Sequence, residues 1–130
     1  MTRFVVDAAV ALRVIRDVRQ VAEQHQLVAP AALRSEVLSL LYRTARTGAL
    51  SEAGARHQLD ALAGLKIRLL ADRVSRATAW KIASQLGWND IGPAEFLAVA
   101  ALQADALVTE DERLADQRLV PTATYEDLFR

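Results

Sequence analysis

The stretch FVVDAAVAL, residues 4–12, sets a single carboxylate, Asp7, between an apolar run and the start of a helical pattern. Residues 4–6 form a short continuous β-rich run, which is typical of a strand buried on both faces. From residue 8 to about 24 the spacing is helical, with one apolar stripe made of Val10, Val14, Val18 and Val21. A carboxylate at the end of a buried strand is costly unless it is hydrogen-bonded, paired or bound to a cation. Asp7 is therefore a candidate functional residue, and the alternative is that it caps the helix it precedes.

The rest of the chain alternates between strand-like and helical segments. Runs typical of strands occupy residues 27–29, 66–70, 106–108 and 119–120, and helical patterns cover residues 30–47, with Pro30 in the first turn, 51–64, 75–86 and 93–103. Gly48 and Gly87 are natural helix stops. Alternation without hairpin signals predicts an α/β fold, a three-layer α/β/α sandwich around a short parallel sheet. Ligands of such sheets gather outside the carboxyl ends of the strands.

Length and composition bound the class of protein. The chain has 130 residues, of which 52% are hydrophobic, so we expect a single domain over residues 1–130 with its own core. Sixteen basic residues balance sixteen acidic ones, so net charge gives no attraction to nucleic acid or membrane. There is no cysteine, which excludes disulfides and thiolate zinc sites. No export segment or membrane-spanning stretch is visible, and we expect a soluble, cytoplasmic protein with no membrane partner.

Two further acids fall where a site is expected. Asp111 follows the strand-like run 106–108 and the adjoining Thr109, so it reaches the same sheet edge as Asp7, unless it only caps a helix in a polar turn. Glu36 borders the apolar stripe of Leu33, Val37, Leu40 and Leu41, where a glutamate is partly desolvated. The alternative for Glu36 is an ion pair with Arg13 or with Arg34 of another copy. Converging carboxylates without histidine or cysteine indicate a hard cation, Mg²⁺ or Mn²⁺.

The order of these motifs resembles the PIN-domain family, and in particular the VapC toxins of bacterial toxin–antitoxin pairs. The resemblance rests on VVDAAVAL, APAALRSEVLSLLYR, PAEFLAVA and ADALVTEDERL, and it spans essentially the whole chain. It implies a small α/β/α domain whose acidic cluster binds Mg²⁺ or Mn²⁺ and cleaves RNA. It also implies a homodimer and a cognate antitoxin protein that blocks the site.

The sequence departs from the family pattern at one acidic position. The family places an aspartate immediately before the alanine of its Asp-Ala-x-Tyr-Leu-Ala-Leu-Ala helix, and here that position is Pro93. Asp90, just before the helix, and Glu95, within it, are the two candidate substitutes. Asp90 is preferred, because two residues past Pro93 a side chain is rotated about 200° around an ideal helix.

The resemblance implies a mechanism for these residues. Asp7, Glu36 and Asp111, with Asp90 or Glu95, would hold one or two metal ions that activate a water for phosphodiester hydrolysis. Thr109 is expected to hydrogen-bond a carboxylate or a phosphate, or to be an ordinary strand-end residue. Arg13 and Arg16 would hold the RNA backbone, and the alternative is a solvated helix face.

Other features and rival functions stay open. His25 and His57 are expected on the surface, and Trp80 and Trp88 in the core or a dimer interface rather than as platforms for bases. The main alternative function is a catalytically weakened PIN-like module that binds a protein or RNA partner, and Pro93 supports it. A second alternative is a metal-dependent nuclease that acts on DNA.

Overall fold

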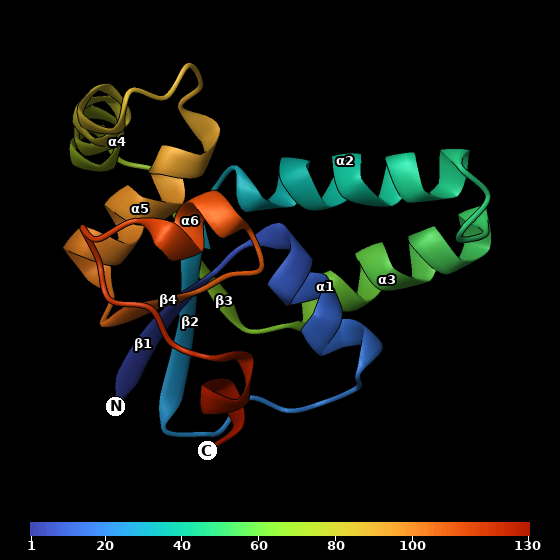
Figure 1. The fold of residues 1–130 in the computed structure, drawn as a ribbon. Coiled ribbons are helices and arrows are strands. Elements are labelled where there is room, and N and C mark those ends of the chain that lie inside the picture. The colour runs from blue at the N-terminus through green and yellow to red at the C-terminus, as the bar shows by residue number, and fades with distance from the viewer.

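The computed structural model describes all residues, 1–130, and its centre is one parallel sheet (Figure 1). The strands are β1 (Thr2–Val6), β2 (His25–Pro30), β3 (Ile67–Leu70) and β4 (Ala106–Val108), in the order β3-β2-β1-β4. Val5 pairs with Val28 on one side and with Leu107 on the other. All pairs are parallel, so the carboxyl ends of the strands share one edge. The α/β class is confirmed.

Apolar packing covers both faces of the sheet. Val5 packs in the larger core cluster with residues of α5 (Gly92–Gln103), whereas Phe4 and Val6 pack in a second cluster with residues of α1 (Ala8–Arg16). Successive strand residues point to opposite faces, so a continuous apolar run is the pattern that such a two-sided core requires. The run 4–6 therefore sets the position of Asp7 at the sheet edge.

The remaining helices extend from this sheet in two directions. α2 (Leu33–Arg46) and α3 (Glu52–Gly64) form an arm to one side, and α4 (Arg73–Leu86) lies against α5 on the other (Figure 1). A short α6 (Glu112–Asp116) follows β4, and a 3₁₀ helix, η1 (Tyr125–Phe129), ends the chain. None of the helices is long and apolar enough to cross a membrane.

The first helix is shorter than the sequence pattern predicts. α1 ends at Arg16, and Val18 has a left-handed backbone (φ 51°) and is 89% exposed. The stripe through Val18 and Val21 was therefore wrong. The chain leaves the helix to meet the C-terminal segment, where Arg19 donates to Glu126 through both terminal guanidinium nitrogens, Nη1 and Nη2, at 2.8 and 3.0 Å.

Two further boundary predictions were wrong for local reasons. Pro30 ends β2 opposite Leu70 instead of opening the next helix, which begins at Leu33. Residues 119–120 form no strand, because the side-chain oxygen of Gln117 accepts both of their backbone N–H groups at 2.7 and 2.9 Å. A single parallel bridge, from Leu107 to Thr122, is all that joins this segment to the sheet. The stop at Gly87 was right, since its φ of 70° is the left-handed conformation of a helix C-cap.

Candidate active site

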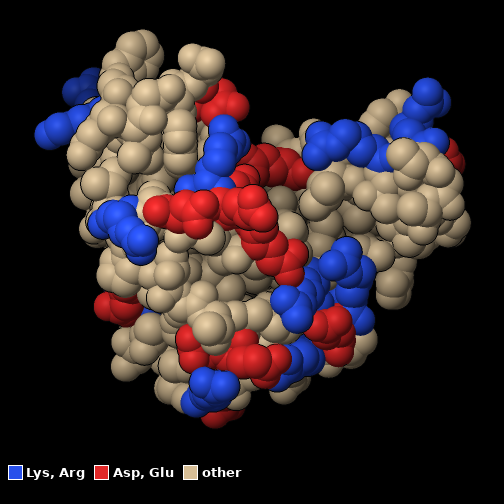
Figure 2. All heavy atoms as spheres, viewed as in Figure 1, with Lys and Arg blue, Asp and Glu red and all other residues tan.

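A pocket of about 450 Å³ opens at the carboxyl edge of the sheet. Three predicted acids line it together: Asp7 from the end of β1, Glu36 from α2 and Asp111 from the turn after β4. Glu110, Arg43, Pro93 and Phe96 complete much of the wall. Acidic side chains gather over α6 and the turn before it, beside the hollow that separates them from α2 (Figure 2).

Asp7 is the most enclosed acid of the pocket, with 7% of its surface exposed. One carboxylate oxygen accepts the backbone N–H of Val10 at 2.9 Å, so Asp7 does cap α1. The other oxygen accepts the hydroxyl of Thr109 and, at 3.4 Å, the backbone N–H of Glu110. Burial raises the pKa of Asp7 in spite of these hydrogen bonds, each of which lowers it. No arginine or lysine is paired with this carboxylate.

Glu36 is half-buried at the first turn of α2 and also lacks a cationic partner. Burial raises its pKa to about 7, and the negative charges of Asp7 and Glu95 add to the shift. The predicted alternative, an ion pair with Arg13, does not form, because the Arg13 guanidinium bonds Glu110 at 3.0 Å. The negative charge of Asp7 thus acts on Glu36, and neither carboxylate has a cationic partner.

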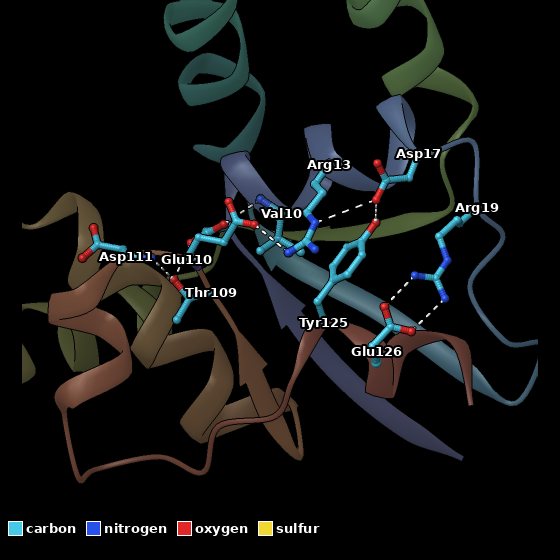
Figure 3. A network of polar contacts seen from close by, with 10 residues as sticks. Val10, Arg13, Asp17, Arg19, Thr109, Glu110, Asp111, Tyr125 and Glu126 are labelled. Carbon is cyan, nitrogen blue, oxygen red and sulfur yellow. Dashed lines mark hydrogen bonds and ion pairs between the residues drawn. The ribbon is translucent and has the colours of Figure 1, made fainter.

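Thr109 joins the ends of two strands. Its hydroxyl donates to Asp7 and accepts the backbone N–H of Asp111 at 3.0 Å (Figure 3). Thr109 thus contacts a carboxylate, one of the two roles considered for it. The bond ties the turn after β4 to the end of β1 and holds the orientation of the Asp7 carboxylate.

Asp111 lines the pocket but is partly satisfied by its own helix. Its carboxylate accepts the backbone N–H of Arg113 at 2.8 Å and lies 4.0 Å from the Arg113 guanidinium. The carboxylates of Asp111 and Glu110 point away from each other in Figure 3. Asp111 is therefore both a pocket residue and the N-cap of α6.

The two candidate substitutes for the acid missing at Pro93 lie in different surroundings. Asp90 is 63% exposed, lies outside the pocket and is 3.8 Å from the Arg113 guanidinium. Glu95 does not line the pocket, but its charge helps to raise the pKa of Glu36. Helix α5 begins at Gly92, one residue earlier than expected. The geometry thus favours Glu95, against the preference for Asp90 drawn from the ideal helix.

Comparisons with known proteins bear on the fold. No protein-family model matches the sequence, and no curated protein matches it. Among solved structures, the chain is similar to PAE2754 from Pyrobaculum aerophilum, with a TM-score of 0.77 and 21% identity, over 98% of this chain and 92% of that one. It is also similar to VapBC2 from Rickettsia felis bound to a DNA fragment from their promoter, with a TM-score of 0.63 and 12% identity, over 94% and 98% of the chains. The chain has a PIN-like fold. The fold that the resemblance implied is confirmed.

The donor atoms of the pocket decide whether it suits a divalent ion. The acids and Thr109 offer oxygen atoms alone, as hard cations prefer. Nowhere in the chain do three acids or histidines come close enough to hold an ion together. Mg²⁺ usually keeps several waters and binds through one or two carboxylates. Asp7 and Glu36 fit that mode, whereas a cage of four protein acids does not form.

Two residues of the pocket were not among the predicted site residues. Glu110 was passed over in the charged turn, although its backbone N–H contacts Asp7 and its side chain holds Arg13. Arg43 lines the pocket and has no ion pair. Its sequence signal is the spacing of seven from Glu36, which places both residues on the same face of α2.

The two arginines predicted to bind RNA differ in their surroundings. The Arg13 guanidinium lies 3.8 Å above the ring of Tyr125 and is paired with Glu110 and Asp17 (Figure 3). Arg16 is exposed and has no ion pair. The charge of Arg13 is thus engaged within the protein, and Arg43 is the pocket cation that no carboxylate holds.

Proposed function

We propose that this chain is a metal-dependent endoribonuclease that acts as the toxin of a toxin–antitoxin pair. One observation carries the proposal: Asp7 and Glu36 line one pocket at the carboxyl edge of the sheet, and neither has a cationic partner. An uncompensated pair of desolvated carboxylates is destabilising, so a fold retains it where the charge has a use. Binding a divalent cation is the use that the oxygen donors favour.

In this proposal, each pocket residue has a defined task. Asp7 and Glu36 bind Mg²⁺ or Mn²⁺, with Asp111 or Glu95 as the further acid near it. When bound, the ion would lower the pKa of a water and stabilise the leaving oxygen of a phosphodiester. Thr109 keeps the Asp7 carboxylate in place through its hydroxyl.

Arg43 is the group of the pocket wall that suits a substrate phosphate. Its guanidinium has no ion pair, and a guanidinium can bind a phosphate through two parallel hydrogen bonds. In the proposal, it holds a non-bridging oxygen of the RNA beside the acids. A protein that cleaves RNA in this way would work in the cytoplasm.

The similarity to a VapBC2 complex supports a protein partner of the antitoxin kind. A suitable surface is the outer face of α2, where Leu38 and Tyr42, one turn apart, are both exposed. An amphipathic helix places apolar residues at such spacing into a groove. We also retain the homodimer that the PIN-like resemblance implies as part of the proposal.

RNA cleavage tests the nuclease directly. We expect the purified protein to cleave RNA with Mn²⁺ or Mg²⁺, to stop with excess chelator, and to cleave DNA much more slowly. Asp7→Asn should abolish cleavage, and Glu23→Gln, at an exposed site outside the pocket, is the matched control. Cleavage that survives in Asp7→Asn, or that persists without metal, would refute the proposed site.

A second function is favoured by a specific observation. Pro93 replaces an acid of the family pattern, and no three carboxylates come close together, so a PIN-like module with weakened catalysis that binds a protein or RNA is the alternative. Ligand binding to the native state must raise its melting temperature. No shift with millimolar Mn²⁺, together with no cleavage, would favour this binding module.

A further inference from the structure

The exposed face of α4 is a surface that the pocket does not account for. Trp80 is 70% exposed and Val74 is also exposed, although the buried side of this helix, with Ala79, Ile82 and Ala83, packs into the core. Trp80 was expected in the core or in a dimer interface, and its exposure excludes the core. Trp88 differs, since it is partly buried and the Arg113 guanidinium lies 5.4 Å from its ring. A large aromatic ring on this face is open to solvent and free to stack on a ligand.

Positive charge surrounds this ring. Helix α4 carries Arg73, Arg76 and Lys81, all exposed, and it contains no acidic residue. None of the three cations forms an ion pair. The single adjoining carboxylate is Asp72, the N-cap, which accepts the backbone N–H of Ser75 at 2.7 Å. In a chain of zero net charge, this face is a local basic patch.

The charge argues against a second copy of this chain as the occupant. A two-fold interface places the same patch on both subunits, so the cations of α4 would meet the same cations of the partner. Like charges across an interface oppose association. An anionic polymer is complementary to the face instead, and exposed aromatic rings among cations are the arrangement that binds single-stranded nucleic acid.

The face lies close to the proposed active site. Helix α4 packs along α5, and α5 supplies Pro93 and Phe96 to the wall of the acidic pocket. The two helices form the side of the molecule opposite the arm of α2 and α3 (Figure 1). A strand that enters the pocket can therefore continue over α5 onto α4.

We propose that the exposed face of α4 binds single-stranded RNA, with a base stacked on Trp80 and phosphates held by Arg73, Arg76 and Lys81. This inference rests on the proposed function for its choice of RNA, because the face would hold the same strand that the pocket cleaves. In this inference, the cations of α4 bind the RNA backbone beyond the pocket, in place of Arg13 and Arg16 of α1.

The test measures binding apart from cleavage. Fluorescence anisotropy of a labelled oligouridine of about 12 nucleotides is recorded in chelator, so that no cleavage occurs and no metal is needed. Trp80→Ala should weaken binding by about 5- to 150-fold, as expected for losing one stacked base, and Trp80→Phe should retain most of the affinity. Val18→Ala, at an exposed apolar side chain after α1 that has no role in either proposal, is the matched control and should change affinity less than about 2-fold.

Two further readouts separate stacking from charge. Tryptophan emission should be quenched by RNA in the native protein and not in Trp80→Phe, which keeps an aromatic ring at position 80 and leaves Trp88 as the one emitting tryptophan. Arg76→Gln should lower the slope of log affinity against log salt by about 0.7, as for one lost phosphate contact, whereas Arg56→Gln on α3 should leave it unchanged.

The outcomes distinguish this inference from the nuclease proposal. Unchanged RNA affinity in Trp80→Ala, or an equal loss in Val18→Ala, would overturn the inference even if Asp7→Asn abolishes cleavage. RNA affinity that depends on Trp80, in a protein that never cleaves RNA, would sustain it while the nuclease proposal fails. Conversion of a dimer to a monomer by Trp80→Ala, with RNA affinity intact, would show that the face joins two copies and would also overturn it.

Discussion

Replacing Glu36 by glutamine should stabilise the protein at neutral and alkaline pH. The carboxylate of Glu36 is half-buried among the charges of Asp7 and Glu95, and no cation is paired with it. An amide of nearly the same shape removes the unfavourable charge and keeps the packing. The native state would then no longer hold a charge that the unfolded chain places in water.

The size of this stabilisation and its dependence on pH follow from the raised pKa of Glu36. The unfolded chain releases this proton near pH 4.5 and the native state near 7, so between these values the native state binds more protons. The free energy of unfolding therefore falls as pH rises through this window, and the full penalty is present above pH 7. Without solvent screening, this shift in the pKa of Glu36 corresponds to about 3 kcal/mol of lost unfolding free energy. Because Glu36 is partly exposed, the expected loss is roughly 1 to 2 kcal/mol. For a chain of this length, that is about 4 to 8 °C in melting temperature.

The assay is urea or thermal unfolding of both proteins in chelator from pH 4.5 to 8.5. The difference between Glu36→Gln and the native protein should be near zero at the acid end, grow through the window and level off above pH 7. Glu23→Gln, exposed and outside the pocket, is the control for removal of a negative charge. A variant that is less stable than the native protein at pH 8, or a difference that does not vary with pH, would refute the view that Glu36 is an uncompensated charge.

Three other substitutions test the contacts around the pocket. Asp7→Asn should keep the melting temperature within about 3 °C or raise it, because asparagine caps helices as well as aspartate does, and circular dichroism melting would check this; a collapse of the fold would contradict it. Thr109→Val should lower the free energy of unfolding by about 1 to 3 kcal/mol in urea titration, because the backbone N–H of Asp111 loses its acceptor, whereas Thr109→Ser should lose much less. Tyr125 donates to Asp17 at 2.8 Å, and burial and this bond raise its pKa to about 12, so absorbance titration should show one tyrosine ionising above the ordinary value, and Tyr125→Phe should remove that step. A titration in which all tyrosine ionises near pH 10 would contradict the buried bond.

The sequence was sufficient to place the acids because their positions depend on a short-range pattern. An acid that follows a buried strand closely lies at the carboxyl edge of the sheet: Asp7 comes directly after β1, and Asp111 comes three residues after the end of β4. Glu36 was found because a charge at the border of an apolar helix face is unusual. In each case, the deciding information lies within about ten residues.

The features that were missed depend on contacts between distant segments. The end of α1 is set by the meeting of residues 17–24 with the C-terminal segment, where the backbone N–H of Ala22 bonds the carbonyl of Leu128 at 3.0 Å. Asp90 was preferred over Glu95 from the rotation of an ideal helix, and the ion pair that Asp90 forms with Arg113 cannot be seen in the sequence. Such tertiary contacts override local pattern.

The distribution of arginine around the pocket explains why two acids stay unpaired in a chain with as many bases as acids. The guanidinium of Arg13 is fixed on Glu110 and Asp17, and that of Arg113 lies between Asp90 and Asp111. These two cations are therefore held by other acids and do not pair with Asp7 or Glu36, and Arg43, which lines the pocket, forms no ion pair with either acid. Ion pairs between cations and the carboxylates of Asp7 and Glu36 would favour stability. A fold without them breaks a general rule of stable proteins at one place, and such exceptions are expected at functional sites. The same arrangement leaves a divalent ion as the positive charge that could restore the balance.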